Sequence, residues 1–123
     1  MAKVAIVEDD KAIAEMYRIK FEADGSKVVT AENGKVGLEV AEKEKPDIIL
    51  LDLMIPVMTG DEMLRELRKS DWGKDTKVII LTNVSKDDAE KKLKDLKIDG
   101  YIVKAHYTPQ EVVDMVKTTL SAK

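Results

Sequence analysis

The stretch Ile48-Ile49-Leu50-Leu51-Asp52-Leu53-Met54-Ile55-Pro56 decides how this chain folds. Its first four residues are apolar without alternation, which is typical of a strand that is buried on both faces of a sheet. The run ends at Asp52, so a carboxylate emerges at the rim of the core. A charge in that place shifts its pKa or acquires a partner, and the other strand ends are where a partner is expected.

Similar apolar runs alternate with helical patterns five times along the chain. We predict strands at Lys3–Val7, Lys27–Ala31, Asp47–Leu51, Lys77–Leu81 and Gly100–Val103, and helices at Asp10–Ala23, Gly34–Lys43, Gly60–Lys69, Lys86–Leu96 and Pro109–Leu120. Strict alternation with short connections predicts an α/β fold with one parallel sheet and helices on both of its faces. The second strand is short and polar, so we place it at an edge. The expected architecture is a doubly wound, flavodoxin-like sheet of five strands in the order 2-1-3-4-5, covered by five helices.

Helix starts are well marked, and two helices have an apolar face. Thr59 with Glu62 and Thr108 with Glu111 form capping boxes, and Asp10 is expected to cap the first helix. The 3.6-residue period predicts that Ile13, Met16, Tyr17 and Lys20 share one face of the first helix, and that Val112, Val113, Val116 and Leu120 share one face of the last.

Composition excludes several classes of protein. The chain has 123 residues, enough for one domain, and a net charge of -3, so we expect direct binding to neither nucleic acid nor membrane. No apolar run approaches the ~20 residues of a membrane span, and no signal peptide precedes Lys3, which predicts a cytoplasmic protein. The absence of cysteine excludes thiol catalysis, and one histidine, His106, cannot form a multi-histidine metal site. A metal would therefore be a hard cation held by oxygen.

Polar side chains follow four of the five predicted strands. They are Glu8 and Asp9 after the first, Asp52 after the third, Thr82 after the fourth and Lys104 after the fifth. In a parallel sheet of this order these ends converge, and ligands bind there. Each residue alone has an ordinary alternative role, such as a cap or a solvated charge. Together, three carboxylates and one ammonium predict a magnesium site, in which one aspartate could act as a nucleophile toward a phosphoryl group held by Lys104 and Thr82.

The motifs Val7-Glu8-Asp9-Asp10, Leu51–Pro56 with Gly60, Leu81-Thr82 and Tyr101-Ile102-Val103-Lys104 resemble the response-regulator receiver domain of two-component signalling, over essentially the whole chain. The resemblance implies that Asp52 is the phosphoacceptor. It implies Mg²⁺, with Mn²⁺ as the alternative, on Asp9, Asp52 and the backbone carbonyl of Met54, with Glu8 acting through water. Lys104 and Thr82 would contact the phosphoryl group, and Tyr101 would turn inward as the switch aromatic.

The chain departs from the family pattern near this site. Ala105 follows Lys104 where proline is usual, so we expect a trans bond there. Asn83 replaces a small apolar residue, and Lys97-Ile98 replace a glycine-containing turn, so the preceding helix is expected to end differently. Met54 and Val84 cannot hydrogen-bond a hydrolytic water, which predicts a long-lived phosphoryl group.

The resemblance implies a phosphorylation-dependent switch, not an enzyme, that promotes its own phosphorylation and slow dephosphorylation. The donor would be a histidine kinase or a histidine phosphotransfer protein. Output would reach a protein partner through the face formed by the predicted helix Lys86–Leu96, the strand Gly100–Val103 and the helix Pro109–Leu120. The domain would act as a monomer or as a phosphorylation-promoted dimer. We expect residues 1–123 to be a stand-alone receiver with no output domain, with a part of a longer regulator as the alternative. One alternative is a phosphorelay intermediate. Another is a small Mg²⁺-dependent phosphatase with an aspartate nucleophile, in which Met54 stands where such phosphatases carry a second aspartate as acid/base. A third is an FMN binder, whose phosphate Glu8, Asp9 and Asp10 would repel.

Overall fold

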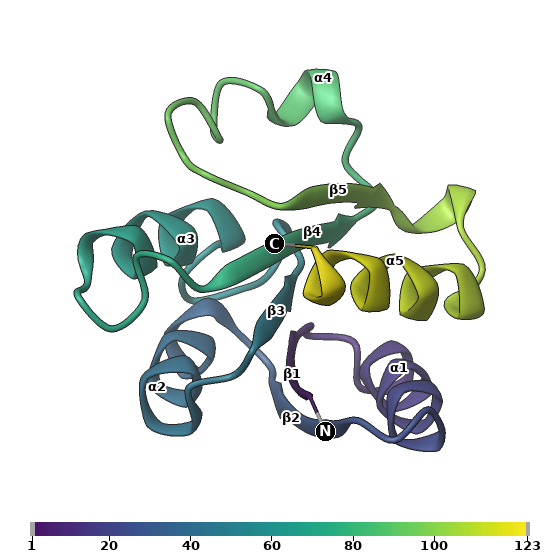
Figure 1. Ribbon diagram of the computed structural model, residues 1–123. Helices are drawn as coiled ribbons and strands as arrows, with labels where there is room; N and C mark the ends of the chain where they lie inside the picture. The colour runs from purple at the N-terminus through teal and green to yellow at the C-terminus, as the bar shows by residue number, and fades with distance from the viewer. Residues whose placement is uncertain (1, 123) are drawn as a thin grey trace.

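The apolar runs form a five-stranded parallel sheet at the centre of the molecule (Figure 1). In this computed structural model, which describes residues 2–122, the strands are β1 (Lys3–Val7), β2 (Lys27–Ala31), β3 (Ile48–Leu51), β4 (Lys77–Thr82) and β5 (Gly100–Val103). Their order is β2-β1-β3-β4-β5, and all neighbours are parallel. The predicted fold, strand order and edge position of Lys27–Ala31 are confirmed.

The two faces of the sheet carry separate cores because successive strand residues point to opposite sides. In β3, Ile48 and Leu50 pack with α1 (Lys11–Ala23) and α5 (Pro109–Ser121), whereas Ile49 and Leu51 pack with α2 (Gly34–Glu44) and α3 (Gly60–Lys69). Figure 1 shows these two helix pairs on opposite sides of the sheet. Burial on both faces explains why the central strands are continuously apolar. None of the helices in the described part of the chain has the length and apolar character of a membrane span.

The helices begin at the predicted caps. The Asp10 carboxylate accepts a hydrogen bond from the Ile13 N–H at 3.0 Å. In α5 the Thr108 hydroxyl accepts from the Glu111 N–H at 3.1 Å, and the Glu111 carboxylate accepts from the Thr108 N–H at 2.8 Å. The predicted cap at Asp10 and the predicted capping box of Thr108 with Glu111 are therefore confirmed.

The predicted apolar face of the first helix is partly wrong. Met16 is 39% exposed and Lys20 is also exposed, while the buried residues of α1 are Ala14, Tyr17 and Phe21. Phe21 lies one turn beyond Tyr17 and is buried in the same core cluster, so the buried face of α1 includes Phe21, and Met16 lies outside it. The last helix packs as predicted, with Val112, Val113 and Val116 buried.

The predicted helix at Lys86–Leu96 is mostly not formed. Helix α4 spans only Lys86–Ala89, and turns at residues 90–95 lead to β5. Asp95 has a left-handed φ of 64°. Two arginines of α3 bond backbone carbonyls of this segment, and Leu93 and Leu96 pack against the core in the unwound conformation. The predicted end of this helix at Leu96 is therefore wrong, because α4 stops seven residues earlier, at Ala89.

Candidate functional site

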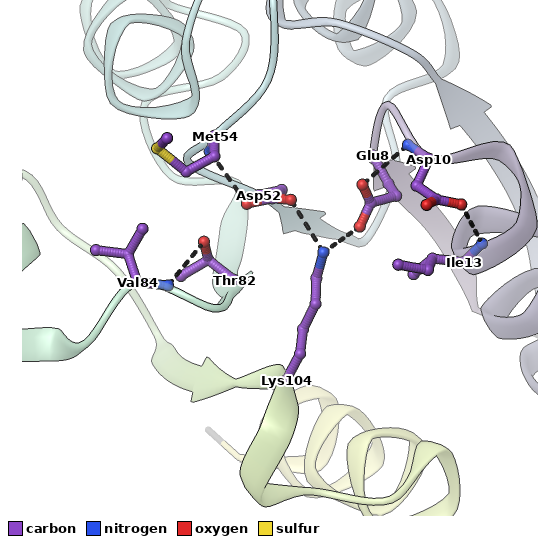
Figure 2. Close-up of polar contacts among 8 residues, drawn as sticks. All are labelled: Glu8, Asp10, Ile13, Asp52, Met54, Thr82, Val84 and Lys104. Carbon is purple, nitrogen blue, oxygen red and sulfur yellow. Dashed lines mark hydrogen bonds and ion pairs between the residues drawn. The ribbon is translucent and has the colours of Figure 1, made fainter.

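The strand ends bring the predicted polar residues together at one edge of the sheet (Figure 2). Backbone pairing continues one residue past the strands, where the Glu8 N–H donates to the Ala31 carbonyl and the Asp52 N–H donates to the Val7 carbonyl. This pairing fixes where both carboxylates leave the sheet. Both side chains are nearly buried, with residue exposures of 6% for Glu8 and 7% for Asp52.

The loop after Asp52 is folded closely around that residue. One oxygen of the Asp52 carboxylate, Oδ1, accepts from the Met54 N–H at 3.1 Å. The Gly60 N–H donates to the Leu53 carbonyl at 3.1 Å. A Cβ atom on Gly60 would lie 2.2 Å from the Asp52 carbonyl oxygen, so only glycine allows this approach.

Lys104 bridges the two buried carboxylates. Its ammonium donates to Asp52 Oδ2 at 2.9 Å and to Glu8 Oε1 (Figure 2). Burial raises the pKa of Glu8, although the bond from Lys104 opposes the shift. Burial alone would lower the pKa of Lys104, but its bonds to Glu8 and Asp52 outweigh burial and raise that pKa. The lysine therefore stays charged and holds Asp52 from one side.

A third carboxylate completes an acidic cluster. Oxygen atoms of Glu8, Asp9 and Asp52 lie within 4.8 Å of one another, and Asp9 is exposed to solvent. Lys104 compensates one negative charge of this set and leaves two. An all-oxygen cluster with excess negative charge is the donor set that a hard divalent cation prefers, with water filling the remaining positions. Asp10 stands outside the cluster, because its side chain caps α1 while its N–H donates to Glu8 Oε2 at 3.1 Å.

Thr82 and Tyr101 meet at the loop that leads from β4 to α4. Thr82 is fully buried, and its hydroxyl accepts from the Val84 N–H at 3.4 Å. The Tyr101 hydroxyl donates to the Val84 carbonyl at 2.7 Å and to the Ser85 carbonyl at 3.3 Å. Burial, followed by the charges of Asp52 and Asp88, raises the pKa of Tyr101. Both side chains therefore form hydrogen bonds with the backbone of Val84.

Comparison with known proteins agrees with this geometry. The family model for the response regulator receiver domain matches residues 4–117. The chain belongs to the response regulator receiver family. It is 34% identical over 122 residues to the alkaline phosphatase synthesis transcriptional regulatory protein PhoP of Bacillus subtilis. The alignment covers 96% of this chain and 48% of that protein. The chain thus spans about half the length of the curated relatives it matches.

Solved receiver domains share the fold. The chemotaxis protein CheY4 of Vibrio cholerae superimposes with a TM-score of 0.88 at 29% identity and covers 97% of this chain and 98% of its own. The receiver domain of the Francisella response regulator 1452 gives a TM-score of 0.86 at 31% identity, covering 98% of this chain and 97% of its own. The predicted receiver fold is therefore confirmed over nearly the whole length of the chain.

The departures from the receiver pattern lie at the rim of the site. The bond between Lys104 and Ala105 is trans, as expected, and Lys104–His106 form a single 3₁₀ turn, η1, that leads into the loop before α5. Ala105, His106 and Asn83 are exposed. Met54 is 64% exposed beside Asp52, and Val84 is half-buried beyond Thr82.

The backbone conformation of Val57, in the loop after β3, is not indicated by the sequence. Val57 has a left-handed φ of 68° and is 76% exposed. A β-branched residue is rarely found in this conformation, so the residue type carried no signal for it. The hydrogen bonds of Tyr101 to backbone carbonyls were also missed, because no side-chain pattern marks a carbonyl acceptor.

Proposed function

We propose that this receiver domain is a phosphorylation-controlled binding switch in which Asp52 is the phosphoacceptor. The observation that carries the proposal is the contact of Lys104 with both Asp52 and Glu8, with the Asp9 carboxylate in the same cluster. This arrangement places the Asp52 carboxylate directly against the Lys104 ammonium, with the exposed carboxylate of Asp9 close by. In the reaction, an Asp52 oxygen forms a bond to phosphorus as the phosphorus–nitrogen bond of a donor phosphohistidine breaks.

The residues present fit a magnesium ion. Asp9, Asp52 and the Met54 carbonyl would hold it, with Glu8 acting through water, and Mn²⁺ could replace it. When bound, the ion would neutralise the charge that the transferred group brings. Lys104 would then pair with the phosphoryl group, and the Thr82 hydroxyl would turn toward it. The protein promotes its own modification through these groups and has no separate substrate, so we do not regard it as an enzyme.

We propose that output leaves through the face made by α4, β5 and α5. The Tyr101 hydroxyl reaches the carbonyl of Ser85, which is the residue before α4. Movement of Thr82 would change the position of Val84, to which Tyr101 is also bonded. The partner would be a protein, and the donor a histidine kinase or a phosphotransfer protein. The domain extent, the cytoplasmic location and the oligomeric state stay predictions.

The central test is phosphorylation in vitro. We expect the protein incubated with acetyl phosphate and Mg²⁺ to gain one phosphoryl group by intact mass, and Asp52→Asn to gain none. Two neighbouring variants serve as a matched control. We expect Asp9→Asn to slow the reaction greatly. Asp10→Asn should leave it unchanged, because Asn can still cap α1. Phosphorylation of Asp52→Asn at the wild-type rate would reject the assignment. Turnover of a generic phosphate ester would instead favour the phosphatase alternative.

A further inference from the structure

Residues 86–96, which begin with α4, have a sequence that favours a helix. Ser85 caps it, accepting from the Asp88 N–H at 3.2 Å, and residues 86–96 contain no glycine, proline or β-branched residue. Three acid–lysine pairs stand four residues apart with the acid on the N-terminal side, which is the stabilising orientation. They are Asp87 with Lys91, Asp88 with Lys92, and Glu90 with Lys94.

The segment is nevertheless unwound beyond Ala89. The Glu90 N–H donates to the Asp87 carbonyl and the Leu96 N–H to the Leu93 carbonyl, which are three-residue spacings. Past Ala89, the four-residue spacing of an α-helix is kept in the hydrogen bond from the Leu93 N–H to the Ala89 carbonyl. Asp95 is left-handed, and the three acid–lysine pairs are not among the ion pairs of residues 2–122. A strong conflict between local preference and structure marks a place where tertiary contacts decide the conformation.

Two arginines of α3 make those contacts. Arg65 Nη2 donates to the Lys92 carbonyl at 3.3 Å, which in a continuous helix would accept from the Leu96 N–H. Arg68 donates two hydrogen bonds to the Lys97 carbonyl, from Nε at 3.0 Å and from Nη2 at 2.8 Å. Its remaining nitrogen, Nη1, donates to three carbonyls of the turn between α3 and β4, at Gly73, Lys74 and Thr76. Arg68 is therefore fixed on one side while it holds the segment on the other.

We propose that residues 86–96 form a two-state element, in which Arg65 and Arg68 hold an unwound form against an alternative helix of the same residues. The first arginine captures a carbonyl that the helix needs, and the second fixes the point where the segment joins β5. In Figure 1 the segment runs from α4 toward α3 and returns to β5, as this anchoring requires. The two forms differ in the donor to the Lys92 carbonyl, which is Arg65 in the unwound form and the Leu96 N–H in the helix.

In the unwound form, residues of this segment line a groove beside β5. The groove has a volume of about 810 Å³ and is lined in part by Leu93, Leu96, Ile98 and Tyr101. Rewinding the helix would move Leu93 and Leu96 and reshape the groove, so a protein that binds there would select one form. This link to signalling rests on the proposed function, whereas the two-state element itself does not.

The test measures backbone conformation in the full chain, without a donor or a partner. We expect ¹³Cα shifts of wild type to be helical at residues 86–89 and coil-like at residues 91–95. Asp95→Ala disfavours the left-handed backbone and is expected to raise the helix-to-unwound ratio about fivefold, whereas Asp95→Gly lowers it. Arg65→Met, an exposed change that leaves Arg68 in place, should also raise the ratio.

A matched pair at another left-handed position is the control. Lys45, the residue after α2, has a φ of 47°; Lys45→Ala and Lys45→Gly should change the overall stability and leave the shifts of residues 91–95 as they are. Helical shifts through Leu96 in wild type would overturn the proposal. So would equal shifts in the two Asp95 variants, or an unchanged segment in Arg65→Met. Because these readouts do not involve Asp52, failure of phosphorylation would leave the result intact.

Discussion

At the scale of single residues, the backbone of Asp52 is confined by Gly60. A methyl group on Gly60 would overlap the Asp52 carbonyl oxygen at 2.2 Å and the Leu53 Cα at 2.7 Å. We expect Gly60→Ala to destabilise the fold by about 1–3 kcal/mol in urea unfolding, as overpacking does, and to slow phosphorylation of Asp52. Gly25→Ala is the control, because its φ of 93° is strained for alanine but the surrounding space is open. A Gly60→Ala variant that is phosphorylated at the wild-type rate would contradict the prediction.

Val57 is a residue whose replacement should stabilise the protein. Its left-handed backbone costs a β-branched residue about 1–2 kcal/mol, and its side chain is 76% exposed and gains little from packing. We expect Val57→Gly to raise the free energy of unfolding by about 1 kcal/mol. Val57→Ala, which keeps most of the backbone strain, should change it less. Equal stability of the two variants would show that strain at this position is not the cause.

Met54 and Val84 should govern how long the phosphoryl group lasts. Met54 is 64% exposed beside Asp52, and Val84 lies beyond Thr82, so neither side chain can orient a water by hydrogen bonding. The double variant Met54→Asn/Val84→Glu supplies such groups, and one hydrogen bond of about 1 kcal/mol in the transition state speeds hydrolysis about fivefold. The phosphoryl half-life after removal of the donor tests this. Met16→Asn on α1 is the control, and an unchanged or slower loss in the double variant would reject the idea.

At the scale of elements, the start of α3 depends on the ionised form of Glu62. The Thr59 N–H and hydroxyl each donate to the Glu62 carboxylate at 2.9 Å and hold its pKa below its usual range. A carboxyl group whose pKa is lowered in the folded state contributes stability above its unfolded pKa and loses it as the pH falls through the folded pKa. We therefore expect Glu62→Gln to lower the urea midpoint at pH 7 and to match wild type more closely at pH 3. A constant difference between the two proteins across this range would contradict the prediction.

The elements also show which parts of the fold can be predicted from sequence. The strand β3 was predictable because a strand buried on both faces leaves a continuous apolar run, and the site followed because parallel strand ends converge. The unwinding of the segment after α4 was not predictable, because its local sequence favours a helix. The carbonyls of Lys92 and Lys97 are bound by Arg65 and Arg68, which lie 27 and 29 residues away along the chain. The face of α1 was misjudged because periodicity alone does not fix which of two adjacent apolar stripes faces the sheet.

At the scale of the whole molecule, the acidic cluster links metal binding to folding. Three carboxylates from two strand ends are brought within 4.8 Å only in the folded chain, and Lys104 compensates one of their charges. A cation that binds only the folded state adds about 1.4 kcal/mol to the free energy of unfolding at ten times its Kd.

We therefore expect Mg²⁺ to raise the urea midpoint beyond the effect of NaCl at equal ionic strength, which controls for screening of surface charge. Asp9→Asn should abolish most of this increment and, because it removes one of the repelling charges, raise the midpoint of the metal-free protein. Asp10→Asn should keep the full increment, since the Asp10 side chain caps α1 and does not face the cluster. If Mg²⁺ stabilises all three proteins equally, the ion binds elsewhere and the cluster is not its site.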